Sequence, residues 1–259
     1  MGVRASGETG GDWAQRTYEA MAPVYDDFTA HYETDAWIAD LIKALENRGL
    51  QGKRLLDVGC GTGKSFLSML AQGWEVTACD ISPAMLELAR EKAGDAVELV
   101  LADMLELPEF GEFDLVWALD DAVNYLLSPE ELERALAGMR ANLAPTGLLL
   151  FDLNELQAYR TFFAETVEVE RNGRQLTWRG TATPDVPPGS ICESRLEVSP
   201  GEVLTHRQRH FPEAEVLTAL KGAGLECLDV YGHGVDGIPR QPLEPTHTKA
   251  IYIARRSEG

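Results

Sequence analysis

Three glycines at alternate positions directly follow an apolar run, and no other feature of the chain constrains its fold as strongly. The run ends in Asp57, and the glycines are Gly59, Gly61 and Gly63. Glycine lets the backbone turn sharply and lets a ligand lie against bare peptide groups. A second apolar run ends in Asp80, at the spacing of about 20 residues at which an acid accepts hydrogen bonds from ribose hydroxyls. The two runs predict adjacent parallel strands with an adenosine-type cofactor at their carboxyl ends.

Two other nucleotide-binding motifs partly match the same glycines. The dinucleotide motif G-x-G-x-x-G requires a last glycine where this chain has Lys64 or Phe66. The phosphate-binding loop G-x-x-x-x-G-K-[ST] is completed by Gly63, Lys64 and Ser65, but its first glycine is replaced by Val58. The ring of amides in such a loop depends on its length, so this match is incomplete. A P-loop-like nucleotide-binding switch is the alternative from a different functional class.

The remaining pattern, acid-x-G-x-G-x-G, resembles motif I of class I S-adenosylmethionine-dependent methyltransferases. The resemblance extends from Tyr18 to Arg255 and includes a likeness to the fourth strand at 113–119 and to the fifth strand at 143–152. It implies an α/β fold with a Rossmann-like, seven-stranded, mostly parallel sheet whose last hairpin strand is antiparallel. It also implies that the cofactor is S-adenosyl-L-methionine and that the protein is a methyltransferase.

The resemblance assigns cofactor contacts residue by residue. Asp57 is similar to the motif I acid, Asp80 to the ribose-binding acid, and Asp103 with Met104 to the segment that contacts adenine. The implied cofactor-binding residues are Asp57, Gly59, Cys60, Gly61, Gly63, Asp80, Ile81, Asp103, Met104 and Leu119. A purely structural interpretation stays open for some of them, because Asp often caps a turn and Met often fills a core.

Strands and helices alternate between residues 54 and 152, which predicts βαβ units and a parallel sheet. The expected strands are 54–58, 75–79, 97–101, 113–118 and 147–152, and the expected helices are 64–72, 83–92 and 129–142. Ser82-Pro83 and Ser128-Pro129 are typical helix starts, with Ser at the N-cap and Pro at the first helical position.

The other segments are expected to form a tail, a cap and an insertion. The first residues are rich in Gly, Ser and Thr, which predicts disorder, and two amphipathic helices then form a cap over the cofactor edge. Short strand patterns around an Asn172-Gly173 turn predict an antiparallel β-insertion that covers the substrate pocket. The expected boundaries are 1–11 for the tail, 12–50 for the cap, 162–211 for the insertion, and 12–161 with 212–259 for the methyltransferase domain, which includes the cap. This insertion makes the chain most similar to small-molecule methyltransferases that act on amino groups of nucleotide-linked sugars.

Charge and cysteine content limit the partners. The chain has 23 Lys and Arg against 42 Asp and Glu, a net charge of −19. Such a field repels nucleic-acid phosphates and anionic membranes and attracts cations, although acidic surfaces also simply keep proteins soluble. We expect a small-molecule substrate that is neutral or cationic, no nucleic-acid or membrane partner, and a monomer or homodimer. The four cysteines lack metal-site spacing, which predicts no metal and a cytoplasmic location.

The acceptor site is expected at the carboxyl ends of the strands. Methyl transfer from a sulfonium is an in-line displacement that needs alignment rather than an obligatory catalytic motif. Strand alternation places His206, Gln208 and His210 on one face, and Arg207 and Arg209 on the other. The candidate catalytic residues are Tyr25, His31 and His206, and the candidate substrate-binding residues are Tyr18, Tyr32, Asn124, Tyr125, Gln208 and Arg209.

We therefore predict methyl transfer to a small-molecule acceptor, at an amine nitrogen. The family likeness and the acidic surface favour an amine. O-methylation of a small molecule is the alternative within the same class, with a histidine as the base. A cofactor-binding regulator without turnover is a third possibility.

Overall fold

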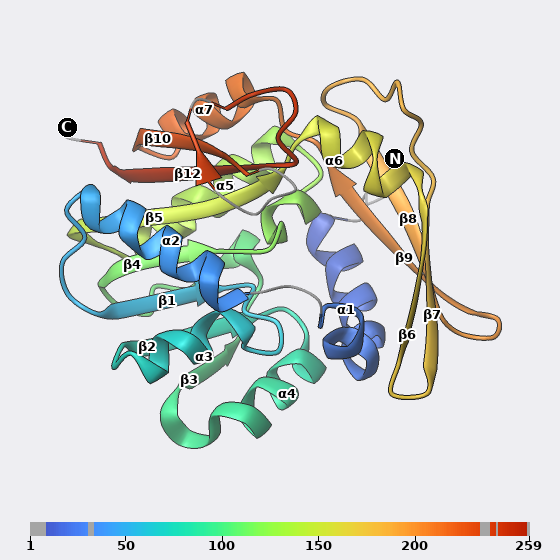
Figure 1. The fold of residues 1–259 in the computed structure, drawn as a ribbon. Coiled ribbons are helices and arrows are strands. Elements are labelled where there is room, and N and C mark those ends of the chain that lie inside the picture. The colour runs from blue at the N-terminus through green and yellow to red at the C-terminus, as the bar shows by residue number, and fades with distance from the viewer. Residues whose placement is uncertain (1–8, 31–33, 234–238, 242, 258–259) are drawn as a thin grey trace, which may run out of the picture.

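The structure, a computed structural model, describes residues 9–30, 34–233, 239–241 and 243–257 (Figure 1). Its main sheet has the strand order β11-β10-β12-β5-β4-β1-β2-β3. The strands are β1 (Arg54–Val58), β2 (Glu75–Asp80), β3 (Glu98–Leu101), β4 (Phe113–Ala118), β5 (Leu143–Asn154), β10 (Leu225–His233), β11 (Pro239–Arg240) and β12 (Lys249–Arg256). Strands β1 to β5 pair in parallel, whereas β12 runs antiparallel between β5 and β10. The predicted Rossmann-like sheet is confirmed, and the two-residue β11 adds an eighth strand at its edge.

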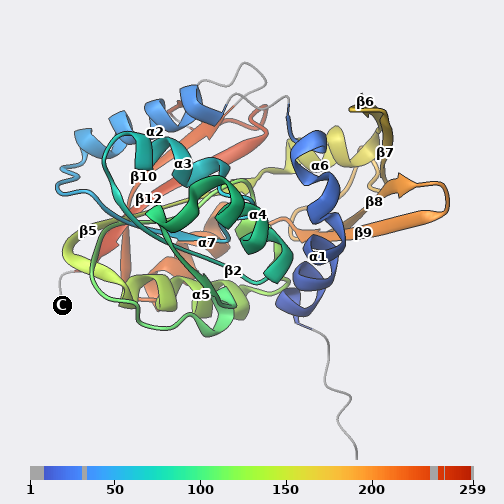
Figure 2. The same ribbon diagram turned by 90° about the horizontal axis from the view of Figure 1, so that it is seen from below.

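Helices cover both faces of this sheet (Figures 1 and 2). They are α2 (Thr34–Asn47), α3 (Lys64–Ala71) and α4 (Pro83–Ala93) on one face, and α5 (Pro129–Ala141) and α7 (Glu213–Gly222) on the other. Strand β1 is buried on both sides because its side chains alternate: Leu55 packs in the cluster of α2 and α3, and Leu56 in the cluster of α5 and α7. As predicted, Ser82 and Ser128 cap α4 and α5, each side chain accepting a hydrogen bond from a backbone N–H of the first turn.

The four-stranded antiparallel insertion is a separate sheet with the order β6-β7-β8-β9. Its strands are β6 (Thr166–Arg171), β7 (Arg174–Gly180), β8 (Ile191–Ser199) and β9 (Glu202–Arg209). Asn172 and Gly173 both have positive φ, as the tight turn between β6 and β7 requires. The short helices are α6 (Leu156–Arg160), η1 (Gly94–Ala96), η2 (Met104–Glu106), η3 (Ala122–Tyr125) and η4 (Phe162–Ala164).

Helix α1 (Gly10–Phe28) packs between the main sheet and the insertion (Figure 2). A third apolar cluster joins Met21 and Phe28 of α1 to Tyr159, Trp178 and Leu196 on the insertion side. Together, α1 and the insertion close off the carboxyl ends of the parallel strands. These ends are where open α/β sheets bind their ligands.

The expected cap is only partly correct. Helix α2 does not cover the cofactor edge, because its apolar stripe, which includes Ile38, Leu41 and Leu45, packs onto the face of the main sheet. A stripe this completely buried needs an apolar partner surface, and the sheet provides it. Helix α1 starts at Gly10, two residues before the expected start of the cap at residue 12. Within the part of the chain that the structure describes, no helix is long and apolar enough to cross a membrane.

Candidate active site

The glycine turn after β1 has the backbone conformation that its sequence predicts. Gly59, Gly61 and Gly63 have φ of +76°, +53° and +88°, a region that residues with a side chain rarely adopt. The Gly59 amide donates a hydrogen bond to the Cys79 carbonyl oxygen at 2.8 Å, which ties the turn to β2. A Cβ atom on Gly63 would lie 2.6 Å from the Phe66 ring, so a side chain there would be both strained and crowded.

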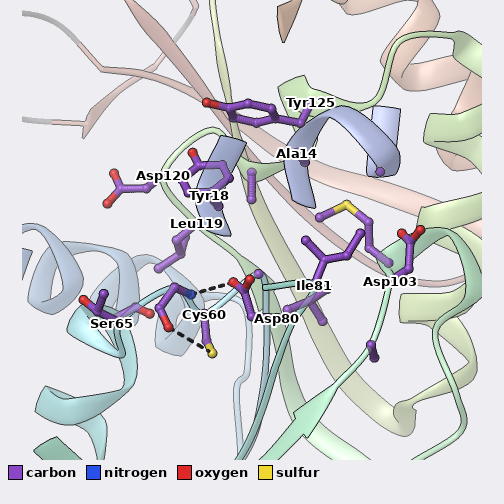
Figure 3. Close-up of a pocket in the computed structure, with 18 of the residues that line it drawn as sticks. Ala14, Tyr18, Cys60, Ser65, Asp80, Ile81, Asp103, Leu119, Asp120 and Tyr125 are labelled. Atoms are coloured by element: carbon purple, nitrogen blue, oxygen red, sulfur yellow. Dashed lines mark hydrogen bonds between the residues drawn. The ribbon is translucent and has the colours of Figure 1, made fainter. Parts of the chain in front are cut away.

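Asp80 holds the turn from the neighbouring strand. Its carboxylate accepts a hydrogen bond from the backbone N–H of Gly61 at 2.8 Å (Figure 3). It accepts another from the backbone N–H of Ser82 at 2.9 Å. Burial raises the pKa of Asp80, while its backbone hydrogen bonds act in the opposite direction. A carboxylate has about four acceptor positions. Asp80 therefore retains acceptor capacity toward the cavity, as a ribose-binding acid requires.

Asp57 lies behind the turn rather than in the cavity. It is buried, and it accepts a hydrogen bond of 2.5 Å from the Ser65 hydroxyl. Burial raises its pKa to about 7. Oδ1 of Asp57 has no hydrogen-bond partner among the described residues. Its contacts position the start of α3, so its expected role in cofactor binding is an indirect one in this geometry.

Lys64 does not stand free for a phosphate. Its ammonium group donates a hydrogen bond to the Thr29 hydroxyl, lies 3.7 Å from an Asp26 carboxylate oxygen, and lies over the Tyr25 ring. All three partners belong to α1 or to the residue that follows it. This arrangement gives the P-loop alternative no support.

The cofactor cavity has a volume of about 900 Å³ and lies above the carboxyl ends of β1, β2 and β4 (Figure 3). Eight of the ten predicted cofactor residues line it: Gly59, Cys60, Gly61, Asp80, Ile81, Asp103, Met104 and Leu119. Asp57 and Gly63 do not. Asp103 accepts a hydrogen bond from the Leu105 amide at 2.9 Å, so it also has the capping role of the structural interpretation.

Part of the segment expected to be a disordered tail instead covers this cavity. Gly10, Gly11 and Ala14 of α1 line it. A Cβ atom on Gly11 would lie 2.6 Å from an Asp103 carboxylate oxygen, so the helix approaches the cavity as closely as glycine allows. The sequence does carry a signal for this helix, because Thr9 and Asp12 form a capping box.

Helix α1 is held over the cavity by polar contacts along its length. The Glu19 carboxylate accepts hydrogen bonds from the Ser82 hydroxyl at 2.8 Å and from the Ala84 amide at 3.2 Å, at the start of α4. The Asp26 carboxylate accepts a hydrogen bond of 2.7 Å from the Thr62 hydroxyl of the glycine turn. These contacts fasten α1 to the start of α4 and to the glycine turn, beside the cavity that its first residues line.

The second cavity, of about 690 Å³, shares four lining residues with the first. These shared residues are Tyr18, Tyr25, Asp120 and Tyr125. The rings of Tyr18 and Tyr125 are 5.1 Å apart and those of Tyr18 and Tyr25 are 6.1 Å apart, so aromatic side chains frame the junction. Two adjoining cavities that meet at a narrow junction suit a reaction between a cofactor and a second molecule.

His206 and Gln208, which strand alternation places on one face of β9, are buried and also line the second cavity. The Tyr125 hydroxyl and Nδ1 of His206 share a hydrogen bond of 2.7 Å, while Nε2 has no partner among the described residues. Burial lowers the pKa of His206 to about 4, so its imidazole is neutral at physiological pH. The Trp178 ring lies 5.2 Å from the imidazole.

A buried acidic cluster forms the floor of the second cavity. Lys249 Nζ donates hydrogen bonds to Asp152 at 2.7 Å and to Asp121 at 3.0 Å, and lies 3.7 Å from Asp120. Gln208 donates a hydrogen bond of 2.6 Å to Asp121. Three carboxylates thus face one ammonium group. Asp120 and Asp121 have φ of +58° and +54°, a strained backbone of the kind found at functional sites.

Some predicted site residues lie elsewhere. Asn124 is buried and structural: it donates a hydrogen bond to the Arg209 carbonyl oxygen and accepts one from the Asn154 amide. The Arg209 guanidinium forms an ion pair of 2.7 Å with Glu215, on the face of β9 that strand alternation predicts. Neither Asn124 nor Arg209 lines either cavity. The candidates His31 and Tyr32 lie outside the described residues.

The residues around the glycine turn match a known domain family. The sequence profile described as "Methyltransferase domain" matches residues 55–147, which contain β1 to β4 and most of the cofactor cavity. Among the residues that the structure describes, no group of His, Cys, Asp or Glu is arranged to hold a metal ion.

The whole chain is similar to known methyltransferases. A Geobacillus sp. (strain WCH70) protein named "Putative methyltransferase GWCH70_2453" is 34% identical over 93% of this chain and 100% of its own length. The Streptomyces venezuelae dTDP-3-amino-3,4,6-trideoxy-alpha-D-glucopyranose N,N-dimethyltransferase is 27% identical over 80% of this chain and 86% of its own.

The fold is also similar to that of a methyltransferase of known structure. The crystal structure of an S-adenosylmethionine-dependent methyltransferase from Clostridium acetobutylicum ATCC 824 superposes with a TM-score of 0.75 at 20% identity, over 93% of this chain and 99% of that one. The positive-φ glycines, the carboxylate of Asp80 and the cavity above them fit the nucleoside of this cofactor. The chain belongs to the S-adenosylmethionine-dependent methyltransferases of Rossmann-like fold, and S-adenosylmethionine is its cofactor.

Proposed function

We propose that this enzyme methylates an amine nitrogen of a small-molecule acceptor. One observation carries the proposal: the second cavity joins the cofactor cavity beside a cluster of three carboxylates that holds a single ammonium group. The formal charge of the cluster is negative, which favours a cationic acceptor over a neutral or anionic one. When bound, S-adenosylmethionine supplies a methyl group on a sulfonium, which is transferred by in-line displacement.

Different residues bind the cofactor and align the acceptor. Asp80 and the glycine turn hold the cofactor, while Tyr18, Tyr25 and Tyr125 narrow the junction and limit the entry of water. Burial raises the pKa of Tyr25 well above its usual range, so its hydroxyl stays protonated and acts as a hydrogen-bonding group. We propose Tyr25 as a catalytic residue in this sense, because it lines both cavities.

The state of His206 favours an amine over a hydroxyl acceptor. A hydroxyl needs a base that takes its proton during transfer, and an efficient base has a pKa near the working pH. Burial lowers the pKa of His206 to about 4, so this imidazole is a weak base. An amine needs only to lose a proton from its ammonium form before transfer. The relative that dimethylates an amino sugar supports the same choice.

Product analysis tests this proposal. The full-length enzyme is incubated with S-adenosylmethionine and matched pairs of acceptors that differ only in carrying an amine or a hydroxyl. We expect release of S-adenosylhomocysteine and a methylated product for the amine of a pair. Transfer to the hydroxyl compound alone would support O-methylation, and cofactor binding with no turnover on any acceptor would support a regulator.

Other expectations from the sequence stay predictions. A cytoplasmic location and a monomer or homodimer follow from the composition of the chain. We further propose that residues 12–161 and 212–259 form the catalytic domain and that residues 162–211 form its substrate-covering insertion. Fractionation of cells that produce the protein tests its location, and light scattering on the purified protein tests its oligomeric state.

A further inference from the structure

Asp120 differs from its acidic neighbours because its carboxylate accepts no hydrogen bond from Lys249. Asp121 and Asp152 each accept a hydrogen bond from Lys249, at 3.0 and 2.7 Å. Asp120 is too far from that ammonium group for a hydrogen bond, at 3.7 Å, and accepts none from the residues that the structure describes. It lines both cavities, and its side chain is 43% exposed. A carboxylate that keeps its hydrogen-bonding capacity is thus placed where the two cavities meet.

His206 supplies a second, independent sign of a ligand. The residue is 2% exposed, and its Nε2 lacks a partner among the described residues although the ring lines the cavity. A buried polar atom without a partner is costly unless something binds it. A polar substituent of the acceptor can do so.

One part of the second cavity, here called its aromatic end, is lined by stacked rings. The Trp178 ring stacks on Phe162 at a centroid distance of 4.7 Å and on Phe28 at 5.8 Å, with interplanar angles of 21° and 26°. Met21 and Ala158 complete this end. Apolar and aromatic walls bind the apolar body of a ligand, and a few polar groups fix its orientation.

The same cavity is poorly suited to a nucleotide-linked sugar. Lys249 is the one cationic side chain among its described lining residues, and the acidic cluster already binds it. Arg207 and Arg209 lie on the other face of β9, in ion pairs with Glu193 and Glu215. A diphosphate would meet carboxylates here instead of the arginines and lysines that bind phosphate.

We propose that the acceptor is an amine with an apolar, ring-containing body, whose ammonium group binds Asp120 and whose body packs against Trp178. The proposal rests on the proposed amine methylation and names the substrate class. The ammonium proton passes to the Asp120 carboxylate, which leaves a neutral amine. Its lone pair forms the new N–C bond as the C–S bond breaks. The products are a methylated ammonium and a neutral thioether, and the Asp120 proton then leaves to solvent.

Asp120→Asn is the informative variant. Asparagine tolerates the positive φ of this position and keeps the size of the side chain, so the variant is expected to fold. Glu226→Gln is the matched control, because Glu226 is an exposed acid on β10 and forms an ion pair with Arg255 of β12. Thermal melting verifies that all variants fold. Trp178→Ala and the conservative Trp178→Phe test the apolar end.

The probes are 2-phenylethylamine, its neutral analogue 2-phenylethanol, and a nucleoside-diphosphate-linked amino sugar. Calorimetry measures their binding to the enzyme saturated with S-adenosylhomocysteine. We expect the amine to bind about 10 to 100 times more tightly than the alcohol, as for a hydrogen bond to a charged group. Asp120→Asn should remove this preference and leave alcohol binding unchanged. Trp178→Ala should weaken both phenyl compounds, with Trp178→Phe close to wild type.

Other results would overturn the proposal. If the preference for the amine persists in Asp120→Asn, Asp120 does not bind the ammonium group. If the nucleotide-linked sugar binds more tightly than the phenyl compounds, or if the phenyl compounds do not bind, the acceptor does not have an apolar body. Methylation of amines that is insensitive to both Asp120 and Trp178 would leave the proposed function standing without this inference. Methyl transfer to hydroxyl acceptors alone would refute both the proposed amine methylation and this inference.

Discussion

At the residue scale, Asp80 combines two tasks that are usually separate. It accepts hydrogen bonds from the Gly61 amide of the glycine turn and from the Ser82 amide at the start of α4, and it still presents a carboxylate to the cofactor cavity. Glycines have many accessible conformations, so the hydrogen bond from the Gly61 amide to Asp80 helps to fix the turn in one of them. A change at Asp80 therefore affects the ligand contact and the geometry of the turn together.

We expect Asp80→Ala to weaken S-adenosylmethionine binding by about 100-fold or more, because charge-assisted hydrogen bonds are lost on both sides of the carboxylate. Isothermal calorimetry measures the effect. Glu75→Gln is a suitable control, since Glu75 is exposed at the other end of the same strand. Unchanged affinity in Asp80→Ala would place the ribose elsewhere.

His206 should make the fold sensitive to acid. The folded-state pKa of His206 is about 4 against an ordinary value of 6.5, so between these values the unfolded chain binds a proton that the folded protein does not. Stability therefore falls as the pH drops from 6.5 to 4, by up to about 3 kcal/mol from this group.

Urea unfolding over this pH range tests the expectation, with His206→Gln as the comparison. The raised pKa values of Asp57 and Asp120 act in the opposite direction, because their protonation at low pH favours the folded state. They are common to both proteins, so the difference isolates His206. Equal pH dependence in the two proteins would show that this imidazole is not held neutral.

At the element scale, helix α1 controls access to the cofactor. Its contacts with the start of α4 through Glu19 and with the glycine turn through Asp26 hold it across the cavity. We therefore expect the release of bound cofactor to depend on the opening of these contacts. Helix α1 also contains Pro23, which weakens the helix at its own position.

Glu19→Gln should therefore speed dissociation of S-adenosylhomocysteine about 5- to 30-fold, as expected for the loss of a charged cap worth about 1 to 2 kcal/mol. Stopped-flow displacement gives the rate constant. Glu46→Gln in α2 is the control, because Glu46 is exposed on a helix that covers the sheet. Equal dissociation rates in the two variants would mean that the cofactor leaves by another route.

Local signals explain how well the elements are predicted. Ser-Pro pairs mark the starts of α4 and α5, and apolar runs mark β1 to β4 within one residue. Strand β5 begins at Leu143, four residues before its expected start. An amphipathic stripe shows that a helix packs against something but not which surface, so α2 was wrongly assigned to the cap. The start of α1 was placed late, because the Gly- and Ser-rich composition outweighed the capping box at Thr9 and Asp12.

The acceptor site depends on contacts that no local pattern records. The hydrogen bond between Tyr125 and His206 spans 81 residues of sequence, and Lys249 lies 128 residues from Asp121. The glycine turn and Asp80 were predictable because a fixed spacing encodes them. The place of Asp120 beside Lys249 and between the two cavities becomes visible only once β4, β5 and β12 are adjacent in the sheet.

At the scale of the whole molecule, the two sheets and α1 enclose one reaction space in a strongly acidic protein. The parallel sheet provides the cofactor cavity, and the insertion provides the aromatic end of the second cavity. The net charge of −19 extends the preference for cations from the site to the entire surface.

Association of a cationic acceptor should therefore slow as salt is added, because ions screen the surface field beyond a Debye length of about 10 Å at 0.1 M. Stopped-flow binding of 2-phenylethylamine over a salt series tests this, with neutral 2-phenylethanol as the control. If the association rate of the amine does not change with ionic strength, the surface charge does not attract the acceptor, and only the buried acidic cluster can do so.

Methylation of a compound that offers both nitrogen and oxygen tests the central claim most directly. The enzyme is supplied with S-adenosylmethionine and 2-amino-1-phenylethanol, and mass spectrometry of the fragmented product locates the new methyl group. The account predicts methyl on nitrogen, with S-adenosylhomocysteine formed in equal amount. Methyl on oxygen, or no S-adenosylhomocysteine at all, would contradict it.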